Sequence, residues 1–141
     1  MIEFSVDLNS TREHAFDLFT LRISDWWPPD HRPSKNPASR ISLSESGTFV
    51  ERTPDGEEIP LGHVHRWDRP SRLQLDFYLG TNPAQPTRVD VLFEETATGT
   101  RIVVQHRPLA ASNDLWATRV SRFQASWPAL LQALGRQAGL N

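Results

Sequence analysis

The stretch that decides the fold is WATRVSRFQASWPALLQAL, residues 116–134. Its apolar side chains recur every three or four positions, which is the period of a helix with one apolar face. These side chains belong to Trp116, Val120, Phe123, Trp127, Leu130, Leu131 and Leu134. A helix of this kind has to bury its apolar face, so the rest of the chain is expected to supply a matching surface.

The preceding two thirds of the chain carry the pattern of that surface. Between residues 39 and 106, apolar and polar residues alternate in six short segments separated by turn sequences such as TPDG, residues 53–56. Proline presets φ in such a turn, and glycine accepts a positive φ. The pattern predicts an antiparallel meander in which each strand has one apolar and one polar face.

The N-terminal segment predicts one more strand and a helix. Residues 2–8 alternate in the same way, and Ser10 followed by Glu13 has the spacing of a capping box. The helix that follows is expected to end near Trp26. The sum is a strand, a helix, six meander strands and a long helix, all in a single domain covering residues 1–141.

Composition excludes several classes of protein. A net charge of −2 argues against a nucleic-acid partner, which usually selects for a basic face. No apolar run approaches the roughly 20 residues of a membrane-spanning helix, and the first residues do not resemble a signal peptide. With no cysteine there is no disulfide framework and no thiolate ligand or nucleophile. We therefore expect a cytoplasmic protein without membrane insertion.

Seven short motifs then suggest a family. They are AFDLFT (15–20), DWWP (25–28), GTFVERTPDGEE (47–58), GHVHRWDRPSRL (62–73), PTRVDVLFE (86–94), GTRIVVQH (99–106) and WPALLQAL (127–134). In this order and spacing the chain resembles the START-like, or SRPBCC, superfamily, in the branch of homologues of the activator of the heat-shock protein 90 ATPase.

The resemblance implies an α+β helix-grip fold. In that fold a curved seven-stranded antiparallel sheet wraps around a long C-terminal helix, a short helical segment follows the first strand, and a hydrophobic cavity lies between sheet and helix. Relatives include lipid carriers, hormone receptors and polyketide cyclases, so the fold alone does not settle the function.

The aromatic residues are the main candidates for lining such a cavity. Trp26 and Trp27 stand directly before Pro28 and Pro29. They fit a purely structural role, closing the first helix against the sheet and packing under the proline-rich loop, and they also fit a wall at the cavity mouth that the two prolines stiffen. The side chains expected to line the cavity are Trp26, Trp27, Phe49, His65, Trp67, Phe77, Val91, Phe93, His106, Trp116, Phe123 and Trp127.

Which face of the strand at residues 57–67 lines the cavity depends on the next hairpin. If Trp67 pairs with Leu73, the odd-numbered residues, including His63 and His65, join the apolar wall. If Trp67 pairs with Arg72, they face solvent, because one register step reverses the faces. Since Ile59 and Leu61 are also odd-numbered, we expect His65 to point inward.

His63 and His65 form the pair H-x-H on one strand, a spacing that some metal sites use. A third ligand would be needed, and His106 is the candidate. If the strands follow chain order, His106 lies three strands away, or about 14 Å. We therefore expect neither a metal site nor a cofactor.

His106 alternates with apolar neighbours and is expected to point inward. It fits a buried imidazole bonded to the backbone, and it also fits a polar group that orients a ligand. As a general base it would need a partner such as Glu51, and Arg52 would complete the set.

Three functions follow from these observations. The leading hypothesis is a non-catalytic or minimally catalytic binder of one small apolar molecule, such as a lipid or a polyketide. The second is an enzyme of the cyclase, dehydratase or hydrolase kind that uses His106. The third is an interaction module resembling the chaperone-ATPase activator, which is doubtful because the chain starts directly with the first strand. A homodimer is left open.

Overall fold

The structure is a computed structural model that describes residues 1–140. The seven strands are β1 (Ile2–Leu8), β2 (Arg40–Leu43), β3 (Thr48–Arg52), β4 (Glu58–Asp68), β5 (Arg72–Asn82), β6 (Gln85–Glu95) and β7 (Thr100–Pro108). The helices are α1 (Arg12–Phe19), α2 (Ile23–Trp26), α3 (Asn113–Ala138) and two short 3₁₀ turns, η1 (Pro29–His31) and η2 (Ala110–Ser112). None of these helices is long and apolar enough to cross a membrane.

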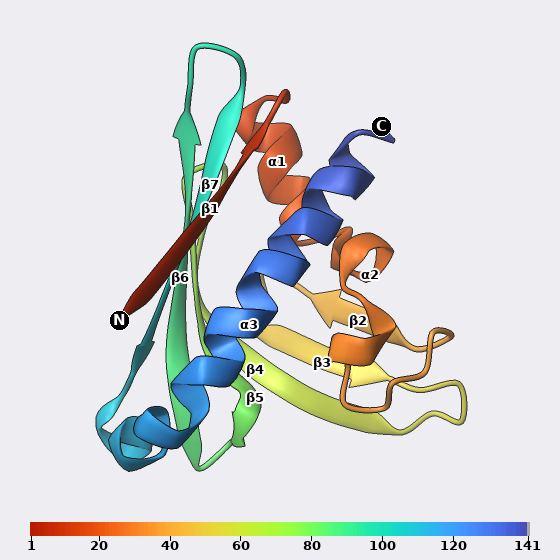
Figure 1. Ribbon diagram of the computed structural model, residues 1–141. Coiled ribbons are helices and arrows are strands. Elements are labelled where there is room, and N and C mark those ends of the chain that lie inside the picture. Colours follow the sequence, from red (N-terminus) through yellow and green to blue (C-terminus); the bar gives the residue numbers. More distant parts are fainter. Residues whose placement is uncertain (141) are drawn as a thin grey trace.

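The strands form one curved antiparallel sheet in the order β1-β7-β6-β5-β4-β3-β2. Strands β2 to β7 follow one another as the predicted meander, and β1 pairs with β7 at the far edge, from Ile2 opposite His106 to Leu8 opposite Thr100. Helix α3 crosses the concave face (Figure 1). The α+β helix-grip prediction is confirmed.

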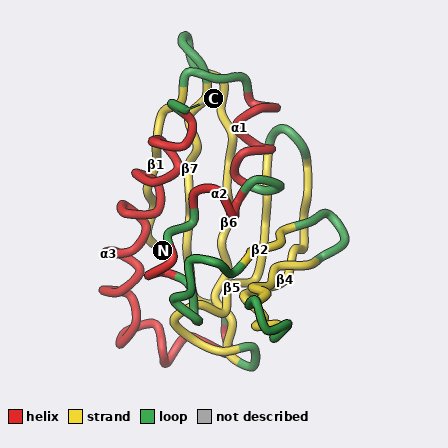
Figure 2. The backbone as a smooth tube through the Cα atoms, turned by 90° about the vertical axis from the view of Figure 1, so that its right-hand side faces the viewer, coloured by secondary structure: helices red, strands yellow, loops and turns green. Residues whose placement is uncertain are grey.

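Two layers cover the concave face. Helix α3 lies over one part, with Phe123, Trp127 and Leu134 buried beneath it. The other part lies under α1, where the Phe16 ring packs against Phe93 at 5.0 Å between ring centroids. The view in Figure 2 shows α1 and α2 on the side of the sheet that α3 also occupies. The N-terminal helices therefore fill part of the space that the sequence pattern left to α3 alone.

The single helix expected after β1 is in fact two helices. The hydroxyl of Thr20 donates to the carbonyl oxygen of Phe16 at 2.7 Å, and α1 ends there. A hydroxyl that bonds back to the preceding turn competes with continuation of the helix. The N-cap is Thr11 rather than Ser10, since the Thr11 hydroxyl accepts the bond from the amide of His14.

A β-bulge at His65 decides which face of β4 turns inward. Trp67 pairs with Leu73, as in the first of the two registers, but the ladder shifts between Val64 and Arg66. The extra residue reverses the alternation, so Val64 points inward and His65 is exposed. The expectation that His65 faces the cavity is wrong, because it assumed an unbroken strand.

The bulged strand approaches its neighbours most closely at Gly62. A Cβ at this position would lie 2.1 Å from the carbonyl oxygen of Asp76 and 2.8 Å from the Phe49 ring. In α3, by contrast, a Cβ at Gly135 would meet only Val6, at an ordinary 3.7 Å.

We expect Gly62→Ala to destabilise the protein by at least about 2 kcal/mol, because backbone and ring would both have to move. The matched variant Gly135→Ala should leave stability unchanged or raise it by up to about 1 kcal/mol, since alanine favours a helix. Urea unfolding followed by tryptophan fluorescence measures both. Equal stability of the two variants would contradict this account of the sheet.

Candidate functional site

A chain of buried hydrogen bonds joins α3 to the middle of the sheet. The indole N–H of Trp127 donates to Nδ1 of His106 at 3.0 Å. The other ring nitrogen, Nε2, lies 2.7 Å from the hydroxyl of Thr87, and that hydroxyl donates to the carbonyl oxygen of Phe77 at 3.2 Å. Because an indole N–H can only donate, Nδ1 is the unprotonated nitrogen and Nε2 carries the hydrogen that Thr87 accepts.

In this arrangement His106 has no free ring nitrogen with which to act as a general base. Its side chain is fully buried, and burial lowers its pKa to about 3, so the ring is neutral at ordinary pH. Both nitrogens are occupied by protein groups. Neither proposed partner is near: Glu51 bonds to Ser34 and Ser39, and Arg52 pairs with Glu58. His106 therefore anchors α3 to the sheet. It is the buried imidazole considered as the structural alternative, but its partners are the side chains of Trp127 and Thr87 and not the backbone.

The interior beneath α3 is filled by aromatic rings. Trp127 lies 5.8 Å from Phe77 and 6.2 Å from Trp27, measured between ring centroids. A space of about 10 Å³ remains among these rings and their neighbours. This is room for one water molecule at most. The enclosed apolar cavity expected at this place is thus replaced by a packed core.

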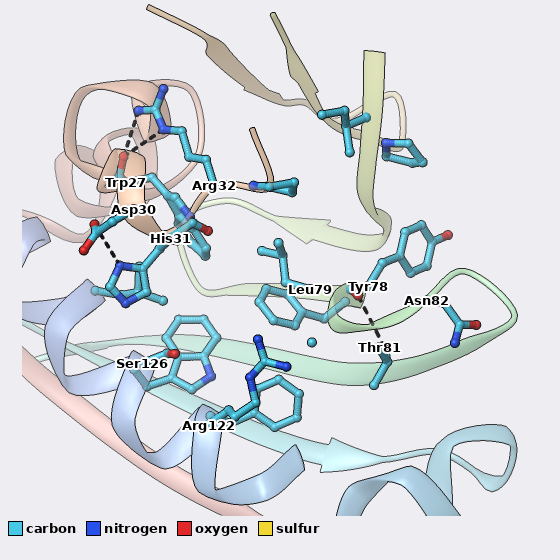
Figure 3. A pocket seen from close by; sticks show the side chains of 18 of the residues that line it. Trp27, Asp30, His31, Arg32, Tyr78, Leu79, Thr81, Asn82, Arg122 and Ser126 are labelled. Carbon is cyan, nitrogen blue, oxygen red and sulfur yellow. Dashed lines mark hydrogen bonds and ion pairs between the residues drawn. The ribbon is translucent and has the colours of Figure 1, made fainter. Parts of the chain in front are cut away.

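An open cleft of about 660 Å³ lies at one end of this core instead. One wall is α3, the second is the end of β5 with the turn that follows it, and the third is the proline-rich loop after α2 (Figure 3). Its apolar lining consists of Trp27, Pro33, Ile59, Pro60, Phe77, Leu79, Pro83, Phe123, Trp127 and Leu130. Its polar and charged lining includes Asp30, His31, Arg32, Lys35, Tyr78, Thr81, Asn82, Arg122 and Ser126. Apolar side chains make up about half of this lining, and the polar groups among them could orient a ligand, as polar groups do in small-molecule sites.

The β5 wall forms where the pairing of β5 with β6 is irregular, before it resumes at Asn82 opposite Gln85. Its pairing with β6 is interrupted between Phe77 and Asn82, opposite Pro86, which has no amide hydrogen to donate. Gly80 adopts a φ of +81°, and a Cβ there would lie 2.6 Å from the Phe123 ring. Glycine thus lets the strand turn against α3, where the Arg119 side chain donates to the Gly80 carbonyl oxygen at 2.9 Å.

Two buried charges hold the loop wall in place. The Arg32 guanidinium, only 5% exposed, donates to the carbonyl oxygens of Ser24, Trp27 and Ser39. The carboxylate of Glu51, fully buried on β3, accepts bonds from the hydroxyls of Ser34 and Ser39 at 2.5 and 2.6 Å. Burial acts to raise the pKa of Glu51, but these hydrogen bonds outweigh it and the pKa lies below its usual value. The loop is therefore fixed by paired buried groups rather than left mobile.

Four of the residues expected to line a cavity line this cleft: Trp27, Phe77, Phe123 and Trp127. The remaining eight, Trp26, Phe49, His65, Trp67, Val91, Phe93, His106 and Trp116, lie elsewhere. Trp67 and Phe93 pack under α1 against Phe16. Trp26 donates its indole hydrogen to the Leu18 carbonyl oxygen, and Trp27 donates its own to the His31 carbonyl oxygen in the proline-rich loop. Both are buried, as in the structural role considered for them, and Trp27 also borders the cleft.

The histidine pair of β4 lies on the outer face of the sheet. The rings of His63 and His65 are 5.1 Å apart, and Nε2 of His65 lies 3.0 Å from a carboxylate oxygen of Asp76, which also pairs with Arg88. His106 lies three strands away, as the strand order predicted. Within residues 1–140 no three histidine or acidic side chains are grouped so that they could hold a metal ion.

Sequence reasoning missed the polar lining of the cleft. Arg122 and Ser126 are one helical turn apart and flank the apolar stripe of α3, so a helical projection could have indicated them. Nothing in the sequence indicated that Arg32 is buried beside the cleft, because an arginine in a loop is ordinarily solvent-exposed.

The neutral state of His106 makes stability depend on pH in a defined way. In the unfolded chain a histidine binds a proton below about pH 6.5, whereas the folded protein does not until about pH 3, so stability falls as pH drops through this window. Between pH 7 and pH 4 we expect the loss from this residue to be on the order of 3 kcal/mol. The unfolding free energy of the wild type relative to His106→Gln should decrease by this amount, because the other histidines contribute to both proteins. A pH-independent difference would show that His106 is not buried in its neutral form.

Removing the charge of Glu51 tests the loop. Glu51→Gln should destabilise the protein by about 3 kcal/mol, because the buried Arg32 loses its neighbouring counter-charge. The control Glu58→Gln removes an exposed carboxylate that pairs with Arg52 and should have little effect. Thermal unfolding compares the two variants. A similar melting temperature for both would refute the assigned role of the buried carboxylate.

Comparison with known proteins places this geometry in a family. Residues 9–138 match the family model described as "Activator of Hsp90 ATPase homolog 1-like protein". A search of curated proteins finds no match. Among solved structures, the self-sacrificing resistance protein CalC from Micromonospora echinospora is similar at 25% identity and a TM-score of 0.76, over 97% of this chain and 92% of that one.

Two more distant structures share the fold. The AHSA1-like protein from Aeromonas hydrophila has 18% identity and a TM-score of 0.64, over 99% of this chain and 94% of that one. A protein from Arthrobacter aurescens has 11% identity and a TM-score of 0.68, over 99% of this chain and 86% of that one. The chain therefore belongs to the family of activator of Hsp90 ATPase homolog 1-like proteins, within the START-like (SRPBCC) superfamily.

Proposed function

We propose that this protein binds one small, largely apolar molecule in the open cleft between α3, the end of β5 and the proline-rich loop. The observation that carries the proposal is the cleft itself, whose volume of about 660 Å³ is that of a drug-sized ligand. Its floor offers the rings of Trp27, Phe77 and Trp127, which are held by the packed core behind them. A preformed floor reduces the entropy that binding has to overcome.

Binding is favoured over catalysis by the state of His106. A general base, the catalytic role considered for His106, needs a ring nitrogen that is free to take a proton. Both nitrogens of His106 are engaged by Trp127 and Thr87. The proposed ligand is held by apolar contact and by polar groups at the rim, and it is released without chemical change.

A second candidate function concerns what the binding is for. The likeness to CalC, described as a self-sacrificing resistance protein, extends over nearly the whole of both chains. Sequestration of a toxic apolar compound in the cleft would be one use of such a protein. Expression in a sensitive bacterial host should then raise the inhibitory concentration of that compound.

A bulky side chain in the cleft tests the binding proposal. Ser126 lines the cleft, whereas Ser121 lies on the exposed side of the same helix. We expect Ser126→Trp to weaken binding of the neutral fluorescent probe N-phenyl-1-naphthylamine by at least about tenfold, because the indole would occupy the ligand's space. Ser121→Trp should bind the probe like the wild type. Fluorescence titration gives the affinities, and native mass spectrometry gives the ratio, expected to be one to one.

Two results would defeat the proposal. One is wild-type protein that does not bind the probe or any member of a panel of fatty acids and polyketides. The other is equal weakening by both tryptophan substitutions, which would indicate a change in the helix and not in the cleft.

A further inference from the structure

We propose that the ligand of the cleft carries one carboxylate and that Arg122 is the residue that pairs with it. The inference rests on the proposed function and names the chemical class of the ligand, an apolar organic acid. It is carried by the position of Arg122 and by the balance of charge around the cleft.

Helix α3 presents two parallel rows of side chains to the cleft. Phe123 and Trp127, four residues apart, form an apolar row. Arg122 and Ser126, also four residues apart, form a polar row beside it. Figure 3 shows the Arg122 side chain reaching from α3 toward the opposite wall, on which Tyr78 and Thr81 lie. A molecule lying along the helix would therefore meet rings with its body and a guanidinium with one end.

The other charged groups of the cleft are already engaged. All three side-chain nitrogens of Arg32 donate to protein oxygens, and Glu51 lies close enough to compensate its charge. The carboxylate of Asp30 lies 3.3 Å from Nδ1 of His31, and the ammonium of Lys35 donates to the Asp30 carbonyl oxygen at 3.1 Å.

Arg122 differs from these groups. Within residues 1–140 its guanidinium makes no hydrogen bond and no ion pair. It stands one residue from a buried ring, at a cleft whose lining contains the cations Arg32, Lys35 and Arg122 and a single carboxylate, Asp30. Because Glu51 compensates Arg32, the excess in the cleft is one positive charge, from Lys35 and Arg122 against Asp30, although the net charge of the whole chain is −2. Such a local excess of positive charge favours an anionic ligand.

The number of free donors favours a carboxylate over a phosphate. A guanidinium offers a planar pair of N–H groups that matches the two oxygens of a carboxylate. The neighbouring hydroxyl of Ser126 adds one more donor on the same helix face. A phosphate carries more charge and more acceptor oxygens and usually requires several cationic or backbone donors. The apolar floor requires that the rest of the molecule be hydrophobic.

Two fluorescent probes of the same shape test the inference. Pyrenebutyrate carries a carboxylate, and pyrenebutanamide replaces it with a neutral amide. We expect the wild-type protein to bind pyrenebutyrate more tightly than the amide. Arg122→Gln should weaken pyrenebutyrate binding by about tenfold or more and leave the amide unchanged, since only the acid uses the charge. Arg122→Lys should retain part of the preference.

The matched control is Arg136→Gln, which removes the same charge from the same helix but lies outside the cleft. It should bind both probes as the wild type does. If both probes bind equally and Arg122→Gln changes neither, the carboxylate inference fails while the proposed function stands. If Arg136→Gln weakens acid binding as much as Arg122→Gln, the effect is one of net charge and the inference also fails. If neither probe binds the wild type, the proposed function and the inference fall together.

Discussion

The hydrogen bond from Trp127 to His106 is the constraint on which the remaining structure depends. Both partners are buried, and an indole N–H or an imidazole nitrogen left unpaired there would cost a large part of the stability of a small domain. Helix α3 can satisfy this bond in only one position over β7. From that position Phe123 packs on the His106 ring at 4.3 Å between centroids, and the next turns of the helix cover the core. One polar contact inside an apolar layer thus sets where the helix lies.

The place of the cleft follows from what fills the concave face. The N-terminal helices bring Phe16, Phe19 and Trp26 against the sheet, and the enclosed space among the aromatic rings beneath α3 is reduced to about 10 Å³. The cleft lies where the pairing of β5 with β6 is irregular, and the loop held by Arg32 and Glu51 forms its other side. The protein has a solid aromatic core with an open cleft at its end, and this is the arrangement that suits an exchangeable ligand.

Several features could be predicted because they depend on local pattern alone. Glu94 lies opposite Arg101, and His106 points inward, as alternation within continuous strands requires. Prediction failed where a strand is irregular or a charge is buried. The bulge at His65 turns that side chain outward, and Arg32 is almost fully buried in a loop because its charge is compensated by Glu51 across 19 residues of sequence. Neither a bulge nor a distant counter-charge produces a periodic pattern in the sequence.

The sequence by itself determined the seven strands, the long C-terminal helix and the family, because a period of two or 3.6 residues and a turn sequence are properties of neighbouring residues. Only the tertiary structure decided that Trp27, buried in the core like Trp26, also borders the cleft, and that His106 is an anchor. It also decided that Arg122, which makes no ion pair within residues 1–140, lies at the cleft beside Phe123 and Trp127. These roles depend on which distant side chains meet, and the packing of α1, α2 and α3 on a bulged sheet sets that only when the whole chain has folded.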